Sequence, residues 1–315
     1  MLMTRSLATA LLACGILAAT SPLQAQVRTA DPAKRGVALT EFPRMVKLAD
    51  NVYGYEEIRG PGFTTVSLVV VGTNGVLVAD GQGSVDATST MLQRIRALTP
   101  LPVKWYVVGS DHGDHTAGNS VLPKDITYIV HRNSLAQLKR DSIAGAANNR
   151  VVVVPPRAMT SDEEVVDVGT MKVHVKFLGR AHTGGDLMVH LPQQRILFMS
   201  EAYLNRVFPA MRSAYPTEWV AVADRALAMK DVERFIPGHG FIESAPVSRE
   251  ELVNYRDALK AVIAEVKRLK AQGLSVDDAI KAANWGQYGE WFLASQQGAV
   301  AVRKVYEELE GKLKE

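Results

Sequence analysis

Four histidines lie beside glycine, aspartate or proline near the predicted ends of strands, where side chains from different segments can converge on one ligand. His112, Asp114 and His115 lie within four residues, directly after an apolar segment. His182 lies in a glycine-rich turn, and His239 in the sequence Pro-Gly-His-Gly. Imidazole nitrogens and carboxylate oxygens are natural ligands of zinc and similar divalent cations. These residues therefore predict a metal site at one edge of a sheet.

A further carboxylate, Glu201, follows another apolar segment and is also a candidate ligand. For residues 112–115 taken alone, a hydrogen-bonded loop with one Asp–His pair remains an alternative to a metal site. The same pattern recurs in three other segments, which favours the metal. His131, His174 and His190 each stand alone in strand-like surroundings, and we interpret them as structural residues.

Alternating strand and helix patterns are expected to position these side chains. An Asn-Gly pair at 74–75, between two β-branched runs, predicts a hairpin. Residues 46–55 and 151–154 are each predicted to form one strand, and residues 85–98 an amphipathic helix. From Ser248 onward the chain is predicted to be helical, beginning with a capping box. This alternation indicates an α/β chain.

The composition is typical of a folded globular chain. Of the 315 residues, 47% are hydrophobic and 22% are charged, which excludes a disordered tail protein and a disulfide miniprotein. The net charge is +3, and the basic residues are scattered among acidic ones. Because nucleic-acid binding needs clustered basic residues, we expect no nucleic-acid partner. A multi-span membrane protein is excluded because no second long apolar run follows the N-terminal one.

Residues 1–26 have the pattern of a secretory signal peptide. Arg5 precedes an apolar run, Pro22 breaks it, and Ala25 offers a small residue for cleavage. We therefore expect a periplasmic or secreted protein with no membrane span after removal of the signal. An uncut anchor and a lipoprotein, with Cys14 in a loose lipobox, are alternatives, although the apolar run continues past that cysteine. If the whole signal peptide is removed, the mature chain has no cysteine, which suits an oxidising compartment.

Residues 46–243 resemble the metallo-β-lactamase-fold hydrolases in four motifs that follow in order. Residues 111–119, DHGDHTAGN, match the family's metal motif, of form H-x-H-x-D-H followed by Gly-Asn. The segments around His182, Glu201 and His239 match those that carry its later ligands. The resemblance implies an α/β fold, namely an αββα metallo-β-lactamase-like sandwich with a C-terminal helical extension. This fold hosts many chemistries, so it does not identify the substrate.

The resemblance also implies how the chain is divided. The sequence contains no internal repeat and no low-complexity stretch that would indicate additional domains. We expect a signal peptide at 1–26, an N-terminal lead-in at 27–45, the metallo-β-lactamase-like domain at 46–245, and a helical extension at 246–315 that packs on that domain.

Two metal positions are implied by the same resemblance. The first would be held by His112 and His182. The second would be held by Asp114, His115 and His239. Glu201 falls where many members have a metal-bridging aspartate, and it would bridge the two positions or bind one of them.

Ser110 stands where the family's motif has its first histidine. A hydroxyl is a poor zinc ligand, so the first position is left with two histidines. Three alternatives follow: one zinc at the second position, two metals with Glu201 or water compensating, or a degenerate centre that only binds a ligand. We favour a metal at the second position and leave the first open. Asp111 is a further candidate ligand, although a surface or supporting role suits it better.

The implied activity is that of a zinc-dependent hydrolase with one or two zinc ions. A metal-activated hydroxide would attack a small-molecule ester, lactone, thioester or amide. Asp114 would hold and orient this nucleophile, and Ser110 would hydrogen-bond to it. The alternatives are hydrolysis of β-lactam antibiotics, iron-dependent redox chemistry and non-catalytic ligand binding by a descendant of a hydrolase.

Three arginines flank the candidate site segments. Arg180, Arg206 and Arg212 would be able to pair with an anionic substrate. An ordinary surface role is the plainer interpretation of each.

Overall fold

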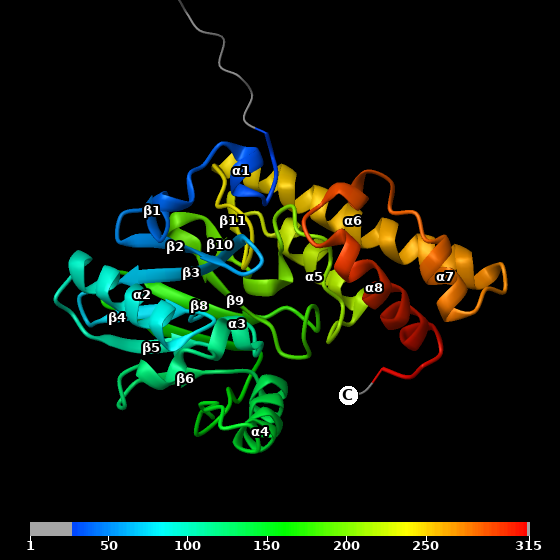
Figure 1. The fold of residues 1–315 in the computed structure, drawn as a ribbon. Helices are drawn as coiled ribbons and strands as arrows, with labels where there is room; N and C mark the ends of the chain where they lie inside the picture. The colour runs from blue at the N-terminus through cyan, green and yellow to red at the C-terminus, as the bar shows by residue number, and fades with distance from the viewer. Residues whose placement is uncertain (1–26, 314–315) are drawn as a thin grey trace, which may run out of the picture.

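The computed structural model describes residues 27–313, and the predicted signal peptide lies outside them. Two sheets pack face to face, and helices cover their outer sides (Figure 1). This is the predicted αββα sandwich, and the fold class is confirmed. Within residues 27–313, none of the helices combines the length and the apolar character that a bilayer crossing requires.

The first sheet has six strands in sequence order. The first four are antiparallel and the last two are added in parallel. The strands are β1 (Arg44–Ala49), β2 (Val52–Arg59), β3 (Phe63–Val71), β4 (Val76–Ala79), β5 (Val103–Val107) and β6 (Thr127–Ile129). The predicted Asn-Gly turn joins β3 to β4, which pair antiparallel, so the hairpin prediction is confirmed.

The second sheet has the order β11-β10-β9-β8-β7. Its neighbours are antiparallel except for β10 and β11, which run parallel. The strands are β7 (Glu163–Asp167), β8 (Lys172–Phe177), β9 (Leu187–Leu191), β10 (Ile196–Phe198) and β11 (Arg234–Ile236).

The helices form the outer layers. The α-helices are α1 (Pro32–Arg35), α2 (Val85–Leu98), α3 (Gly113–Thr116), α4 (Arg132–Ala146), α5 (Pro216–Ala228), α6 (Ala245–Ala271), α7 (Val276–Ala282) and α8 (Ala294–Leu309). Short 3-10 turns are η1 (Leu39–Glu41), η2 (Asn119–Val121), η3 (Pro192–Gln194), η4 (Ser200–Ala202) and η5 (Gly286–Glu290). In Figure 1 the helices α5, α6 and α8 gather on the right side of the molecule, and α4 projects at the bottom, below β6.

The alternation of strand side chains divides the core into layers. In β3, Leu68 and Val70 face the second sheet, where they pack with Val189 of β9. Their neighbour Val69 points to the other face and packs with Met91 of α2. Apolar residues on both faces make β3 a fully buried strand, which explains its continuous apolar sequence.

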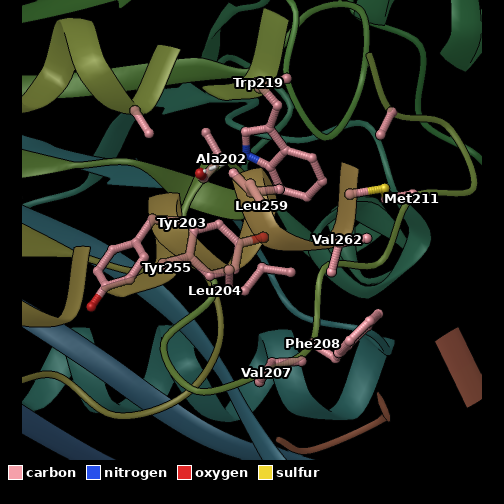
Figure 2. Close-up of a cluster of buried hydrophobic side chains, with 14 of the residues drawn as sticks. Ala202, Tyr203, Leu204, Val207, Phe208, Met211, Trp219, Tyr255, Leu259 and Val262 are labelled. Carbon is pink, nitrogen blue, oxygen red and sulfur yellow. Dashed lines mark hydrogen bonds between the residues drawn. The ribbon is translucent and has the colours of Figure 1, made fainter. Parts of the chain in front are cut away.

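A third cluster lies between the second sheet and the C-terminal helices (Figure 2). Trp219 of α5 packs beside Tyr255 of α6, with ring centroids 5.8 Å apart, and its indole nitrogen donates to the carbonyl of Ala202. Figure 2 shows that Tyr203 and Leu204, just after η4, lie in the same cluster. The C-terminal helices therefore support the segment that carries Glu201.

Three local predictions are wrong. Residues 46–55 form parts of two strands, because the chain turns at Asn51, whose short polar side chain tolerates a φ of 62°. Residues 151–154 form no strand, since Val151 is 68% exposed and the segment has no ladder partner among the described residues. The predicted capping box lies inside α6, which begins at Ala245 with proline in its first turn.

Candidate metal centre

Loops at one edge of the sandwich carry the candidate ligands. His112 precedes the one-turn helix α3 that follows β5, and Asp114 and His115 lie within this helix. His182 lies between β8 and β9, while Glu201 lies in η4, directly after β10. His239 lies in the turn after β11. The carboxyl ends of β5, β10 and β11 thus supply most of the donors, as sites in α/β sheets commonly do.

Close packing of these loops requires glycine at Gly238. A Cβ atom there would lie 2.5 Å from the carbonyl carbon of Ser200, closer than such atoms approach. The amide of Gly238 also donates to the Ser200 carbonyl, at 2.7 Å. The turn that carries His239 is therefore held directly against the segment that carries Glu201.

The first group of donors consists of Asp114, His115, Glu201 and His239, whose ligand atoms all lie within 4.8 Å of one another. The Nε2 atoms of His115 and His239 are 3.2 Å apart. Nε2 of His239 also lies 3.0 Å from Oδ2 of Asp114 and 3.2 Å from Oε1 of Glu201. The structure thus brings together the three residues predicted for the second metal position and adds Glu201.

The second group consists of His112, His182 and Glu201. Nδ1 of His112 lies 3.0 Å from Nε2 of His182 and 3.0 Å from Oε2 of Glu201. Nε2 of His182 lies 3.1 Å from Oε1 of the same carboxylate. Because this Oε1 atom also contacts His239, Glu201 reaches both groups, which is the arrangement expected of a bridging carboxylate.

Contacts outside the two groups orient the imidazole rings. Nδ1 of His239 donates to the carbonyl of Thr64 at 2.9 Å, which directs its Nε2 atom toward the other donors. Nδ1 of His115 lies 3.1 Å from Oδ2 of Asp80. The hydroxyl of Ser213 lies 3.2 Å from Nε2 of His112. Such partners fix the tautomer and ring direction of metal-binding histidines.

Burial and mutual charge shift the pKa values of the donors. Burial by itself would raise the pKa of Glu201, but neighbouring histidines, His182 first, hold it well below its usual range. Burial would lower the pKa of His115, yet Asp80 and other carboxylates raise it to about 10. For His112, Glu201 likewise outweighs burial and the pKa rises to about 9. The metal-free site therefore gathers protons, which is how a concentrated negative charge behaves without a cation.

This donor set fits a divalent metal ion. Imidazole nitrogens and carboxylate oxygens lie about 3 Å apart, and three of the four rings contact a partner through the nitrogen that faces away from the other donors. Zinc is bound by these ligand types, and three protein ligands suffice for a catalytic site. The group around His239 offers four donors and the group around His182 offers three.

Ser110 is fully buried, and its hydroxyl donates to Oε2 of Glu201 at 2.6 Å. It therefore supports the carboxylate that joins the two groups. The neighbouring Asp111 belongs to neither group and instead lines a cavity beside His112. Burial raises the pKa of Asp111 to about 7.

Two further residues contact the donors and were not predicted. Asp80 follows β4 with a φ of 62° and also accepts hydrogen bonds from the amide of Gly109 and the hydroxyl of Ser200. An Asp-Gly pair at the end of an apolar strand is the signal that could have found it. Arg59 at the end of β2 lies 2.8 Å from Oδ2 of Asp114, and nothing in the sequence distinguishes it from other arginines.

The arginines predicted to flank the site differ in their surroundings. Arg180 pairs with Glu218, and Arg206 pairs with Glu251. Both guanidinium groups are therefore engaged in structural ion pairs. Arg212 lines the cavity beside His112.

Comparisons with solved structures agree with this architecture, while no family model matches the chain. The chain is similar to the stereoselective inverting sec-alkylsulfatase Pisa1 from Pseudomonas sp., with 14% identity and a TM-score of 0.68. That match covers 84% of this chain and 50% of the other, so this chain spans about half the length of the alkylsulfatase. It is also similar to the metallo-beta-lactamase from Pontibacter korlensis, with 20% identity and a TM-score of 0.57, over 69% of this chain and 98% of that one.

Proposed function

The chain has the metallo-β-lactamase fold, and on that premise we propose that it is a zinc-dependent hydrolase of a small molecule. The observation that carries the proposal is the convergence of His112, His182, Glu201 and the group around His239 at one edge of the sandwich. Four separate segments supply these donors. Fold alone does not establish an activity, whereas convergent donor side chains indicate a specific chemistry.

The residues of the candidate site would have distinct roles in hydrolysis. A divalent metal, when bound, supplies a Lewis acid and lowers the pKa of a water molecule. Glu201 stays ionised between the histidines and would hold both positions together. Asp114, tethered by Arg59, would orient the attacking water, and His115 and His239 would complete that position. Ser110 would act through Glu201 and not on the water, because its hydroxyl donates to that carboxylate.

The substrate class proposed is a small-molecule ester, lactone, thioester or amide. The alkylsulfatase and the β-lactamase that the fold resembles suggest sulfate esters and β-lactams as additions to the substrate panel. Two histidines and one carboxylate, as in the group around His182, also form a donor set used by iron enzymes. Metal analysis of natively expressed protein would decide between zinc and iron.

The test combines metal content per chain with hydrolysis of ester, thioester, lactam and sulfate-ester substrates. We expect His115→Ala and His239→Ala to lose metal and to lower kcat/KM at least a thousandfold. The matched control is His174→Ala, which removes a histidine that pairs with Glu163 outside both groups. Unchanged metal content and activity in both site variants would show that the assignment is wrong.

Export is the second part of the proposal. The N-terminal pattern of residues 1–26 supports secretion to the periplasm or beyond. Fractionation of cells that express the full chain, with N-terminal sequencing of the product, would test it. A cytoplasmic product that retains Met1 would contradict this part and leave the hydrolase proposal standing.

A further inference from the structure

A cavity of about 450 Å³ opens beside the candidate metal centre. Its walls come from α4, from the chain that follows α4, and from the loop that leads into α5. Of the six candidate ligands in the two groups, only His112 also lines this cavity. The cavity therefore adjoins the candidate metal centre at His112.

Three arginines lie on the cavity walls, namely Arg140, Arg150 and Arg212. Among residues 27–313, none of the three forms an ion pair with a carboxylate; Arg140 bonds only the neutral amide oxygen of Gln137, at 2.7 Å. Arg180, which flanks the same site, is by contrast paired with Glu218. Unpaired guanidinium groups that gather in one cavity supply a positive potential without a protein partner.

Two carboxylates also line the cavity, and neither neutralises the arginines directly. Asp141 accepts a hydrogen bond from Nε2 of Gln137 at 2.9 Å. Asp111 is 4% exposed and lies at the side next to His112. Three arginines and two carboxylates thus line the cavity, and the three arginines are exposed.

Short contacts connect the arginine-bearing walls to the centre. Ser213, the neighbour of Arg212, contacts Nε2 of His112 at 3.2 Å. Asn133 of α4 donates to the carbonyl of Gly184 at 2.7 Å, which ties α4 to the turn that carries His182. A ligand group bound by the arginines would therefore lie next to the metal ligands and not on a distant surface.

We propose that this cavity binds an oxyanion of the substrate, so that the hydrolase acts on anionic molecules in preference to neutral ones. The inference rests on the proposed function, because it names the substrate class of the same site. A guanidinium group binds carboxylate, sulfate and phosphate through paired, charge-assisted hydrogen bonds. The volume suits a small molecule and not a polymer.

The kinetic test compares two aryl esters of equal length in the metal-loaded protein. Mono-4-nitrophenyl adipate carries a free carboxylate, and 4-nitrophenyl hexanoate carries none. We expect kcat/KM to be at least tenfold higher for the adipate ester, and this ratio to fall about tenfold in Arg150→Gln and in Arg212→Gln. Arg96→Gln, on the exposed face of α2, removes the same charge outside the cavity and should leave the ratio unchanged.

A binding test makes the inference independent of turnover. Adipate, sulfate and phosphate are titrated separately into the metal-loaded protein and followed by calorimetry, which also distinguishes the three oxyanions. We expect affinity for the preferred anion to fall about tenfold in Arg150→Gln and to be unchanged in Arg96→Gln. Anion binding to the metal alone would not depend on Arg150.

The outcomes separate the two proposals. If neither ester is hydrolysed but anion binding depends on Arg150, the hydrolase proposal fails for esters and the oxyanion cavity stands. If esters are hydrolysed with no preference for the anionic one, and anion binding is the same in all variants, the cavity proposal is overturned and the hydrolase proposal stands.

Discussion

The hydroxyl of Ser110 donates a 2.6 Å hydrogen bond to Oε2 of Glu201, the carboxylate whose oxygens reach both groups of candidate ligands. At the position where the motif of the metallo-β-lactamase-fold hydrolases carries a histidine, this chain therefore carries a serine that hydrogen-bonds to a candidate ligand. Glutamate, one methylene longer than aspartate, reaches the space between His112 and His182. Ser110 and Glu201, the two residues that differ from the motif, are thus joined by a hydrogen bond.

Replacing Ser110 by alanine should weaken metal binding by about tenfold to a hundredfold, because the partner that orients Glu201 is lost. Metal affinity would be measured by competition with a chromophoric chelator. Ser161→Ala, at an exposed position outside the site, is the control. An affinity equal to that of the unmodified protein would mean that Ser110 has no positioning role.

Changing Glu201 to glutamine should remove metal from both positions, whereas aspartate should retain part of the binding. Glutamine has lost the negative charge that His182, His112 and His115 surround. Aspartate keeps that charge but is shorter, so it would reach one group better than the other. Elemental analysis of both variants gives the stoichiometry. Full metal content in Glu201→Gln would contradict a bridging role for this carboxylate.

The metal-free protein should lose stability as the pH rises from about 6.5 to about 10. In the folded chain the pKa of His112 is raised to about 9 and that of His115 to about 10, above the ordinary value of 6.5. Stabilisation by these protonated rings is complete below pH 6.5 and is lost as the pH rises through the folded pKa values. Urea unfolding of chelator-treated protein at several pH values would measure it.

Metal binding should have the opposite pH dependence. Because the metal needs unprotonated imidazole, it must displace the protons on His112 and His115, so affinity should rise with pH. Calorimetry in buffers of different ionisation enthalpy would count the protons released. Release of no protons near pH 7 would contradict the raised pKa values. His115→Gln should release fewer protons than the unmodified protein.

Replacing Trp219 by phenylalanine should destabilise the fold by about 1–3 kcal/mol. The indole is fully buried, its nitrogen donates to the carbonyl of Ala202 at 2.8 Å, and its ring packs against His182 with centroids 5.1 Å apart. The change leaves the carbonyl of Ala202 without its hydrogen-bond donor and weakens the packing against the His182 ring. Thermal unfolding with and without metal would measure both effects. Trp285→Phe, at the partly buried end of the same helical layer, is the comparison.

Local patterns predicted much of the framework and failed where tertiary contacts outweigh them. The Asn-Gly hairpin and the strands that precede the candidate ligands are local features with strong propensities, and they form as expected. β7 was not predicted, because an edge strand with the sequence Glu-Glu-Val-Val-Asp carries too little apolar character. Ser248 is of a residue type that often caps helices, but it lies inside α6. Its hydroxyl accepts a hydrogen bond from the backbone amide of Phe235.

The sequence by itself determined the types of donor, because it contains both the histidines and carboxylates and the apolar strand segments that precede most of them. Only the tertiary structure decided which candidate donors lie together and which residues contact them from outside the two groups. Oxygens of Glu201 reach both groups, and Ser110, Asp80 and Arg59 hold the donors from outside. These contacts join residues far apart in the chain. Their geometry depends on how the two sheets and their loops pack, which no local pattern encodes.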